Sequence, residues 1–455
     1  MTRKPRFALS TTQIILLSFL AVILLGSLLL SLPFAAKDGE AVPYIDALFT
    51  ATTATCVTGL VTLPTATAWS LFGQIVILIL IQVGGLGIIT VMAGVMLALH
   101  RRMGLSDRLL LRDAFNLNTL SGLSSFLKKV LLGTLAVEVT GALLYMTVFV
   151  PEFGAKGIWI SVFNAVSAFC NAGMDIIGEN SLCDYATDPM VNGVTSALVV
   201  LGGLGYIVWW DVLRVIRLVW ERRSFRALSH LTLHSKLAIT ATVTLLLGGA
   251  AIILLCEYGN PATVGDMSFF GKLQAAFFQS VTTRTAGFMT VSQTDLTPAS
   301  TAVCLVLMFI GGSPVGTAGG VKTVTVLILI AYAASTVKGR DEVALFHRRI
   351  PDEALRRSVA VAGTSFLIAA LSTLILAVLT PDGSLTDILY ETVSATATVG
   401  LSRDLTPTLT AAGKLTVAVT MYLGRVGPIS LAIAFGTRRK VTNAVKNPTE
   451  QVSVG

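Results

Sequence analysis

The chain has 455 residues, of which 54% are hydrophobic and only 13% are charged, and its mean hydropathy is +0.78. Because soluble globular proteins carry about 25% charged residues, this composition excludes an ordinary soluble domain and indicates a membrane protein with modest loops. The net charge of +8 raises the question of nucleic-acid binding, which the positions of the basic residues answer.

Apolar runs long enough to cross a bilayer recur along the chain. The first run, residues 12–33, follows a short basic start, and we interpret it as a retained helix because no small-residue cleavage site follows at the usual distance. The other predicted spans cover residues 70–99, 123–150, 192–216, 237–256, 300–335, 358–379 and 409–436. The sequence therefore predicts an all-α membrane protein with eight spans.

The linkers between these runs alternate in charge. Basic stretches at 1–10, 100–129, 214–236, 338–357 and 438–446 hold 25 of the 33 Lys and Arg residues. By the positive-inside rule, these stretches and both termini are predicted to be cytoplasmic, in a multi-pass protein of the cell (inner) membrane. Topology and attraction to the lipid bilayer then account for the positive charge, and no nucleic acid is expected as a partner.

The outer linkers carry a repeat, in which an aromatic residue stands ten positions before a glycine and a large apolar residue follows it. The aromatic residues are Phe49, Phe163, Phe277 and Tyr390, and the glycines are Gly59, Gly173, Gly287 and Gly400. The glycines are 114, 114 and 113 residues apart, which indicates an internal repeat. We predict four span–loop–span units, at residues 1–112, 113–230, 231–350 and 351–455.

Each glycine-bearing segment is too short to cross a bilayer, so it must dip into the membrane and return. Non-helical backbone at that depth persists only where protein buries it or where it lines a water-filled path. Four such segments would form a ring of carbonyls that replaces the water of a cation, with short helices pointing their negative ends inward. The alternative, that each glycine caps an interfacial helix, fits one linker better than four in register. The predicted selectivity-filter residues are Thr55, Cys56, Val57, Thr58, Gly59, Cys170, Asn171, Ala172, Gly173, Thr285, Ala286, Gly287, Thr396, Thr398, Val399 and Gly400.

A second glycine pattern lies 24 to 29 residues after each filter glycine. For Gly84–Gly87 and Gly202–Gly205 we interpret it as tight helix packing. The third cluster, Gly311–Gly320, contains a proline and is predicted to break its helix below the ring, where a gate belongs. The residues assigned to gating are Gly311, Gly312, Ser313, Pro314, Gly316, Thr317, Gly319, Gly320, Lys322 and Arg425.

Two arginines stand in apolar surroundings. Arg425 lies within the last predicted span, too far from its end to reach water, so we expect it to face the pore or a partner carbonyl. Arg284 lies within the third glycine-bearing segment and is expected behind the filter, paired with a carboxylate or a helix end.

These features together resemble the KtrB/TrkH/HKT superfamily of potassium transporters, over nearly the whole chain. The resemblance rests on the four glycine-bearing loops, the Gly311–Gly320 interruption and Arg425. It is strongest for the KtrB branch, because the first span begins within about 12 residues of the start. It implies that the four glycines form a potassium filter, that Gly311–Gly320 is an intramembrane gating loop, and that Arg425 is the basic residue facing the pore.

The resemblance also implies a homodimer with one pore in each protomer, seated on a cytoplasmic ring of RCK-type, KtrA-like subunits. ATP or ADP would bind those partner subunits, and no cofactor is expected in this chain. K⁺ would be held by filter carbonyls alone, with Na⁺ as an activator or symported ion.

Other functions stay open at this stage. A sodium-permeable member of the same superfamily is the nearest alternative, and a non-conducting membrane scaffold is the alternative from another class. The four matched glycines argue against a scaffold. An inverted-repeat secondary transporter would alternate the orientation of its repeats, whereas these four place every loop outside. No nucleophile, paired-carboxylate or metal constellation indicates an enzyme.

Overall fold

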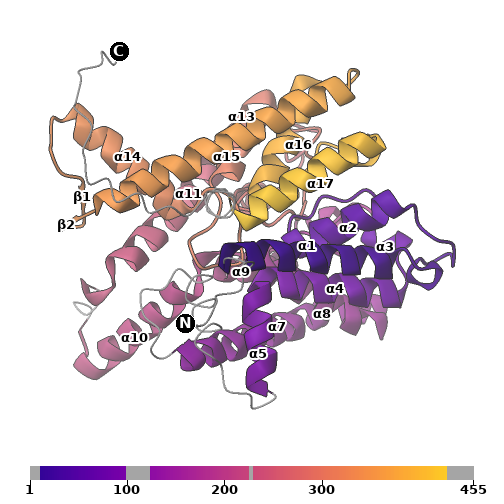
Figure 1. Ribbon diagram of the computed structural model, residues 1–455, viewed down its shortest axis with the longest axis horizontal. Helices are drawn as coiled ribbons and strands as arrows, with labels where there is room; N and C mark the ends of the chain where they lie inside the picture. The colour runs from indigo at the N-terminus through magenta and orange to yellow at the C-terminus, as the bar shows by residue number, and fades with distance from the viewer. Residues whose placement is uncertain (1–10, 99–122, 225–228, 428–455) are drawn as a thin grey trace, which may run out of the picture.

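The computed structural model describes residues 11–98, 123–224 and 229–427, which form an almost entirely helical bundle (Figure 1). We group its helices into four quarters. The first quarter holds α1 (Thr11–Leu30), α2 (Tyr44–Cys56), α3 (Thr65–Ala68), α4 (Leu71–Leu86) and α5 (Ile88–Ala98), and the second holds α7 (Leu123–Phe153), α8 (Lys156–Cys170), α9 (Pro189–Leu204) and α10 (Tyr206–Arg222). The third holds α11 (Leu233–Glu257), α12 (Phe269–Thr282), α13 (Pro298–Phe309) and α14 (Thr323–Val337), and the fourth holds α15 (Asp352–Leu379), α16 (Leu385–Ala397) and α17 (Ala411–Val426).

Short elements join these helices. Three-residue 3₁₀ turns occupy Pro33–Ala35, Cys183–Tyr185 and Thr406–Thr408. Strands β1 (Ala344–Leu345) and β2 (Arg348–Arg349) pair antiparallel in the connection between α14 and α15.

Membrane-spanning character is clearest in the first long helix of each quarter. Within the described residues, α1, α7, α11 and α15 are long and apolar enough to cross a bilayer, and α9 with α10 makes a fifth span if the bent pair counts as one. The predicted spans at these first positions therefore correspond to single helices.

The second predicted span of each quarter is not a continuous helix. The 70–99 span breaks at Gly87 and the 192–216 span at Gly205, where α9 and α10 meet at 99°. The 300–335 span stops at Phe309 and resumes at Thr323, as predicted, while the last described helix ends before Gly427. Residues 428–436 of the final predicted span lie outside the described residues.

Our interpretation of the first two clusters as helix packing was therefore incomplete. Gly87, Gly205 and Gly427 have φ values of +84°, +87° and +85°, a conformation that glycine adopts without the steric cost of a Cβ. The leading glycines of the clusters do serve close packing, because a Cβ on Gly84 or Gly202 would collide with a carbonyl oxygen at the end of a pore helix.

The quarters close into a circle around four short pore helices, α2, α8, α12 and α16. We call α4, α9, α13 and α17, which come after the pore helices in the chain, the return helices. Each return helix packs against the pore helix of the next quarter: α4 on α8, α9 on α12, α13 on α16 and α17 on α2. The pore helices form the centre of the core, and most of their residues are buried. Among the repeated aromatic residues, Phe49, Phe163 and Tyr390 are fully buried, and Phe277 is half-buried.

Side-chain hydroxyl or carboxylate caps fix where the four return helices begin. The side chains of Ser70, Asp188, Thr297 and Thr410 accept hydrogen bonds from backbone N–H groups in the first turns of α4, α9, α13 and α17. Such caps satisfy N–H groups that a helix start leaves unpaired. Each chain segment leaving the centre is thereby turned sharply into its return helix.

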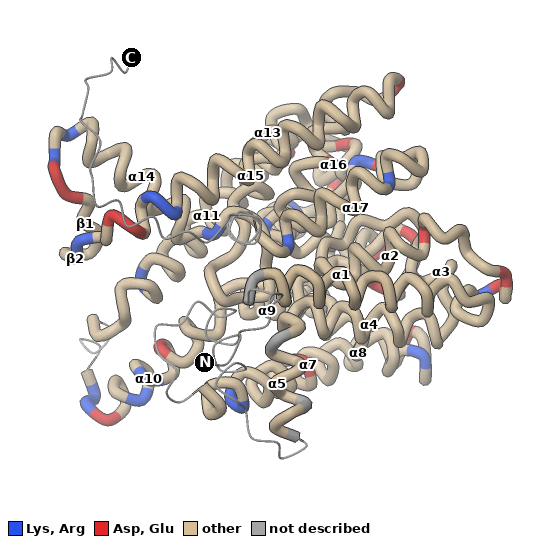
Figure 2. The backbone as a smooth tube through the Cα atoms, in the orientation of Figure 1, with Lys and Arg blue, Asp and Glu red and all other residues tan. Residues whose placement is uncertain are grey.

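Charged residues gather toward the two ends of the long axis and leave a mostly uncharged middle (Figure 2). The end of α10 and the connection with β1 and β2 lie at the same end of the molecule (Figure 1) and carry several of the predicted cytoplasmic basic residues. Both termini and most of the stretches 100–129 and 438–446 lie outside the described residues.

Candidate ion filter and gate

Each pore helix ends in the same unusual backbone turn. Val57, Asn171, Thr285 and Thr398 stand two positions before the four glycines and have φ values of 54°, 60°, 68° and 51°. Positive φ is rare for non-glycine residues and an outlier for β-branched ones. Four outliers at equivalent positions indicate that the segments after the pore helices share one specified geometry.

The four glycines meet at the centre of the circle, also with positive φ. A Cβ built on Gly59 would lie 2.6 Å from the Ala172 carbonyl oxygen and 3.2 Å from the Cα atoms of Gly173 and Gly400. Each of the other three glycines faces the carbonyl of the residue before its neighbour in the same way: Gly173 faces Ala286, Gly287 faces Val399, and Gly400 faces Thr58. The four carbonyls and four glycines thus form a closed ring in the order of the quarters.

Hydroxyl groups in the pore helices hold these segments in place. Thr53 Oγ1 accepts from the Gly59 N–H at 3.0 Å, and Ser394 Oγ accepts from the Gly400 N–H at 3.0 Å. In the other two quarters the hydroxyls of Ser167 and Thr282 donate to the carbonyls of Met174 and Phe288, at 2.5 and 2.6 Å. These bonds tie each segment to its own pore helix, which fixes the backbone that forms the ring.

The structure brings most predicted filter residues to this ring. Val57–Gly59, Asn171–Gly173 and Thr285–Gly287 follow the pore helices, as do Thr398–Gly400. Thr55, Cys56, Cys170 and Thr396 instead belong to the last turns of α2, α8 and α16. They lie at the negative helix ends rather than in the turned segments.

The predicted gating loop lies directly against the filter. Thr317 Oγ1 donates to the Phe169 carbonyl at 3.0 Å and lies 3.0 Å from Asn171 Oδ1, while the Gly319 N–H donates to Thr285 Oγ1 at 3.2 Å. A Cβ on Gly319 would collide with the Thr398 hydroxyl. The loop therefore contacts the second, third and fourth filter segments at once.

The kink of the second quarter also supports this loop. The N–H groups of Ser313 and Thr317 donate to the carbonyls of Gly203 and Gly202, at 2.8 and 3.1 Å. Because these bonds replace those that a continuous helix would make, the broken backbone of both quarters stays satisfied inside the protein.

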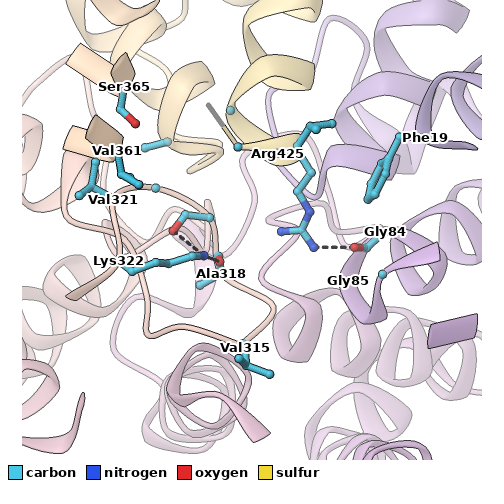
Figure 3. A pocket seen from close by; sticks show the side chains of 18 of the residues that line it. Phe19, Gly84, Gly85, Val315, Ala318, Val321, Lys322, Val361, Ser365 and Arg425 are labelled. Carbon is cyan, nitrogen blue, oxygen red and sulfur yellow. Dashed lines mark hydrogen bonds between the residues drawn. The ribbon is translucent and has the colours of Figure 1, made fainter. Parts of the chain in front are cut away.

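Two basic side chains, Arg425 and Lys322, bind three successive loop carbonyls, and Figure 3 shows the bonds of Arg425 to Gly84 and of Lys322 to Ala318. Arg425 donates to the Thr317 carbonyl at 2.6 Å and also to the Gly84 carbonyl, which joins the loop to the first quarter. Lys322 Nζ lies 2.5 Å from the Ala318 carbonyl and 3.4 Å from that of Gly319. Both line a cavity of about 480 Å³ on the side of the filter where the loop lies.

The remaining predicted gating residues form the base of the loop and its contacts with the second quarter. The loop is closed at its base by a parallel bridge between Ile310 and Val321. Gly311 and Gly320 lie against each other there, where a Cβ on either would meet the other's backbone at 2.9 Å. Gly312, Pro314 and Gly316 form its outer part against Gly203 and Gly205.

Arg284 lies behind the filter, as expected, but its partner differs. Its guanidinium donates to the Thr242 hydroxyl at 3.4 Å, and its Nε has no hydrogen-bond partner among the described residues. The carboxylate that the sequence suggested is not among its hydrogen-bond or ion-pair partners in the described part of the chain.

Sequence reasoning missed a second cavity, which we call the outer vestibule because the predicted topology places its side of the filter outside. A cavity of about 270 Å³ lies over the four glycines, on the side opposite the gating loop. The residues two positions after the glycines all line it: Val61, Asp175, Met289 and Ser402. The repeat register could have found this ring, because these positions follow the filter at constant spacing.

Four re-entrant segments meeting at a ring of backbone carbonyls define a membrane protein with the architecture of ion-conducting proteins. A family model described as TrkH, cation transport protein, matches residues 2–442. The chain belongs to this family. It is a membrane cation transport protein and not an enzyme.

Relatives match the chain almost end to end. The potassium/sodium uptake protein NtpJ of Enterococcus hirae is 38% identical, over 100% of this chain and 99% of the relative. The Ktr system potassium uptake protein B of Bacillus subtilis is 35% identical, over 97% and 96%. The crystal structure of the potassium transporter TrkH from Vibrio parahaemolyticus has the same fold, with a TM-score of 0.75 at 16% identity, over 96% of this chain and 86% of that one.

Proposed function

We propose that this chain is the pore-forming, channel-like subunit of a Ktr-type potassium uptake system. The closed ring of four carbonyls around four glycines carries the proposal, because carbonyl oxygens can replace the water that a potassium ion sheds. The names of the relatives, which include potassium uptake proteins aligned over nearly the whole chain, support it.

Permeation of sodium is the second candidate. One relative is named a potassium/sodium uptake protein. Glycine at all four filter positions is the pattern that the family resemblance associates with potassium, so we place potassium first.

The Gly311–Gly320 loop is proposed as the gate, held closed by Arg425 and Lys322. Hydrogen bonds from a charged donor are stronger than those between neutral groups, and these two side chains fix three successive carbonyls. Opening requires the loop to leave the filter, which breaks the contacts to Asn171 and Thr285 as well.

The assembly is proposed from the resemblance. The chain would form a homodimer in the cell membrane, with both termini in the cytoplasm and a nucleotide-binding, RCK-type ring attached on that side. ATP or ADP on that partner would control the gate, and sodium would act as an activator. Relatives named as parts of a Ktr system support a multi-component complex.

Growth of an uptake-deficient bacterium at limiting external potassium tests the function. We expect the chain to restore growth, and to do so more strongly when a cytoplasmic partner is supplied. Purified chain in liposomes should then carry a rubidium flux. A chain that is inserted in the membrane but supports neither growth nor flux would indicate the non-conducting scaffold instead.

A further inference from the structure

In the ring of residues two positions beyond the glycines, oxygen-bearing side chains stand on one diagonal only. A Cβ on Gly59 would approach Gly173 and Gly400 but not Gly287, so the second and fourth quarters lie diagonally opposite each other across the filter. In the ring two positions beyond the glycines, these quarters contribute Asp175 and Ser402, whereas the first and third contribute the apolar Val61 and Met289.

A buried carboxylate stands behind Ser402. Glu391, in α16, has no exposed surface, and it accepts hydrogen bonds from the Ser402 hydroxyl at 2.7 Å and from the Thr406 hydroxyl. No Lys, Arg or His forms an ion pair with Glu391 within the described residues. Burying a carboxylate without a counter-ion is costly, and no basic side chain in the described part of the chain offsets that cost at Glu391.

The direction of these hydrogen bonds matters for ligand binding. An ionised carboxylate only accepts hydrogen bonds. The hydroxyl protons of Ser402 and Thr406 are therefore turned toward Glu391. Ser402 Oγ also accepts a hydrogen bond from the Thr406 N–H at 3.5 Å, so the oxygen lone pairs of the two hydroxyls are only partly used. Both residues line the vestibule.

The surroundings favour a cation further. Thr62 also lines the vestibule, is 6% exposed, and its Oγ1 has no hydrogen-bond partner in the described chain. The neighbouring Arg403 is turned away, since its guanidinium bonds Asp387 at 2.6 Å and the Gln293 carbonyl at 2.7 Å.

We propose that the outer vestibule holds a loading site for a partly hydrated alkali cation, coordinated by Asp175 and Ser402 across the pore and backed by the buried carboxyl group of Glu391. The inference rests on the proposed transport function and adds a site that precedes the filter. The side chains of Val61 and Met289 supply no oxygen atoms, so water and the Thr62 hydroxyl complete the coordination on the other diagonal.

The test is the external potassium dependence of rubidium and potassium uptake by the full-length chain in cells. We expect Asp175→Asn and Ser402→Ala each to raise KM about three- to tenfold, since a charged funnel raises local cation concentration by such factors. The maximal rate should stay near that of the unaltered chain, because the filter is untouched. Glu391→Gln should raise KM as well. Asp175→Glu keeps the carboxylate and should leave KM near that of the unaltered chain.

Two further variants sharpen the test. Asp184→Asn removes an acid from the same outer segment, outside the residues that line the vestibule, and should leave KM unchanged. Val61→Asp adds a carboxylate to the apolar diagonal and should lower KM. The amount of each variant in the membrane separates misfolding from lost cation binding. If Glu391→Gln does not accumulate in the membrane, the KM values of Asp175→Asn and Ser402→Ala are enough to test the site.

An unchanged KM in both Asp175→Asn and Ser402→Ala, or a loss confined to the maximal rate, overturns the site. A failure of the unaltered chain to take up potassium or rubidium at all counts against the proposed function instead. The two failures are therefore distinguishable in one set of measurements.

Discussion

At the scale of single residues, the filter leaves no room for side chains at its glycines. A Cβ on Gly287 would lie 2.6 Å from the Val399 carbonyl oxygen and 3.1 Å from the Gly173 Cα, at a φ of +82°. Gly287→Ser must therefore move backbone rather than a flexible side chain. We expect the preference for potassium over sodium to fall by about tenfold, which is about 1.4 kcal/mol.

Flux of rubidium and sodium into liposomes measures this change. Gly248→Ala is a matched control, because Gly248 lies in a spanning helix and a Cβ added there would meet no atom within 4 Å. An unchanged selectivity in Gly287→Ser would contradict the carbonyl ring as the selecting element.

Arg425 provides the second prediction at this scale. Replacing it by Gln removes a charge beside the cation path and weakens the bonds to the Thr317 and Gly84 carbonyls. Hydrogen bonds to charged groups contribute about 1.5–3 kcal/mol each, so the closed loop should lose on the order of tenfold in occupancy. The maximal uptake rate should rise. Leu415→Ala, on the exposed side of the same helix, should leave it unchanged.

At the scale of elements, the gating loop and the kinked helices act together. Deleting residues 316–319 removes Thr317 and the loop carbonyls held by Arg425 and Lys322. We expect maximal flux to increase and control by a cytoplasmic partner to weaken. Flux in the presence and absence of that partner is the measurement, and a deletion variant that conducts and responds like the unaltered chain would rule out this loop as the gate.

The elements differ in how far the sequence could predict them. Four glycines at constant spacing were enough to predict four re-entrant segments, and the five glycines and the proline within Gly311–Gly320 were enough to predict a broken helix. The kinks at Gly87 and Gly205 were missed, because a glycine in an apolar run signals close packing and positive φ alike. Partners far apart in sequence, such as Thr317 with Asn171, leave no local pattern. Glu391 could have pointed to the vestibule site, since a carboxylate within a re-entrant segment usually has a functional role.

At the scale of the whole molecule, the circle closes between the last quarter and the first. Lys414 in α17 pairs with Asp46 in α2 at 2.6 Å, and both side chains are largely buried. Lys414→Met leaves the Asp46 carboxylate without this partner, and breaking a buried pair in this way costs about 3–5 kcal/mol. The melting temperature of the purified protein should fall by several degrees.

A double variant provides the control for that prediction. Asp46→Asn combined with Lys414→Met leaves no unpaired charge and should recover part of the lost stability. Equal melting temperatures for the unaltered chain and Lys414→Met would show that the circle does not depend on this pair.

The quarters share one plan, yet among the residues that the structure describes only the third quarter carries a loop beneath the filter. A pore assembled from four identical subunits has four copies of its gate, and these must move in concert. In this chain a single segment would block the path, so opening is one event with one energy difference and has no cooperativity of its own. If uptake responds steeply to a cellular signal, the steepness must originate in the partners that pull on this segment or in a second copy of the chain.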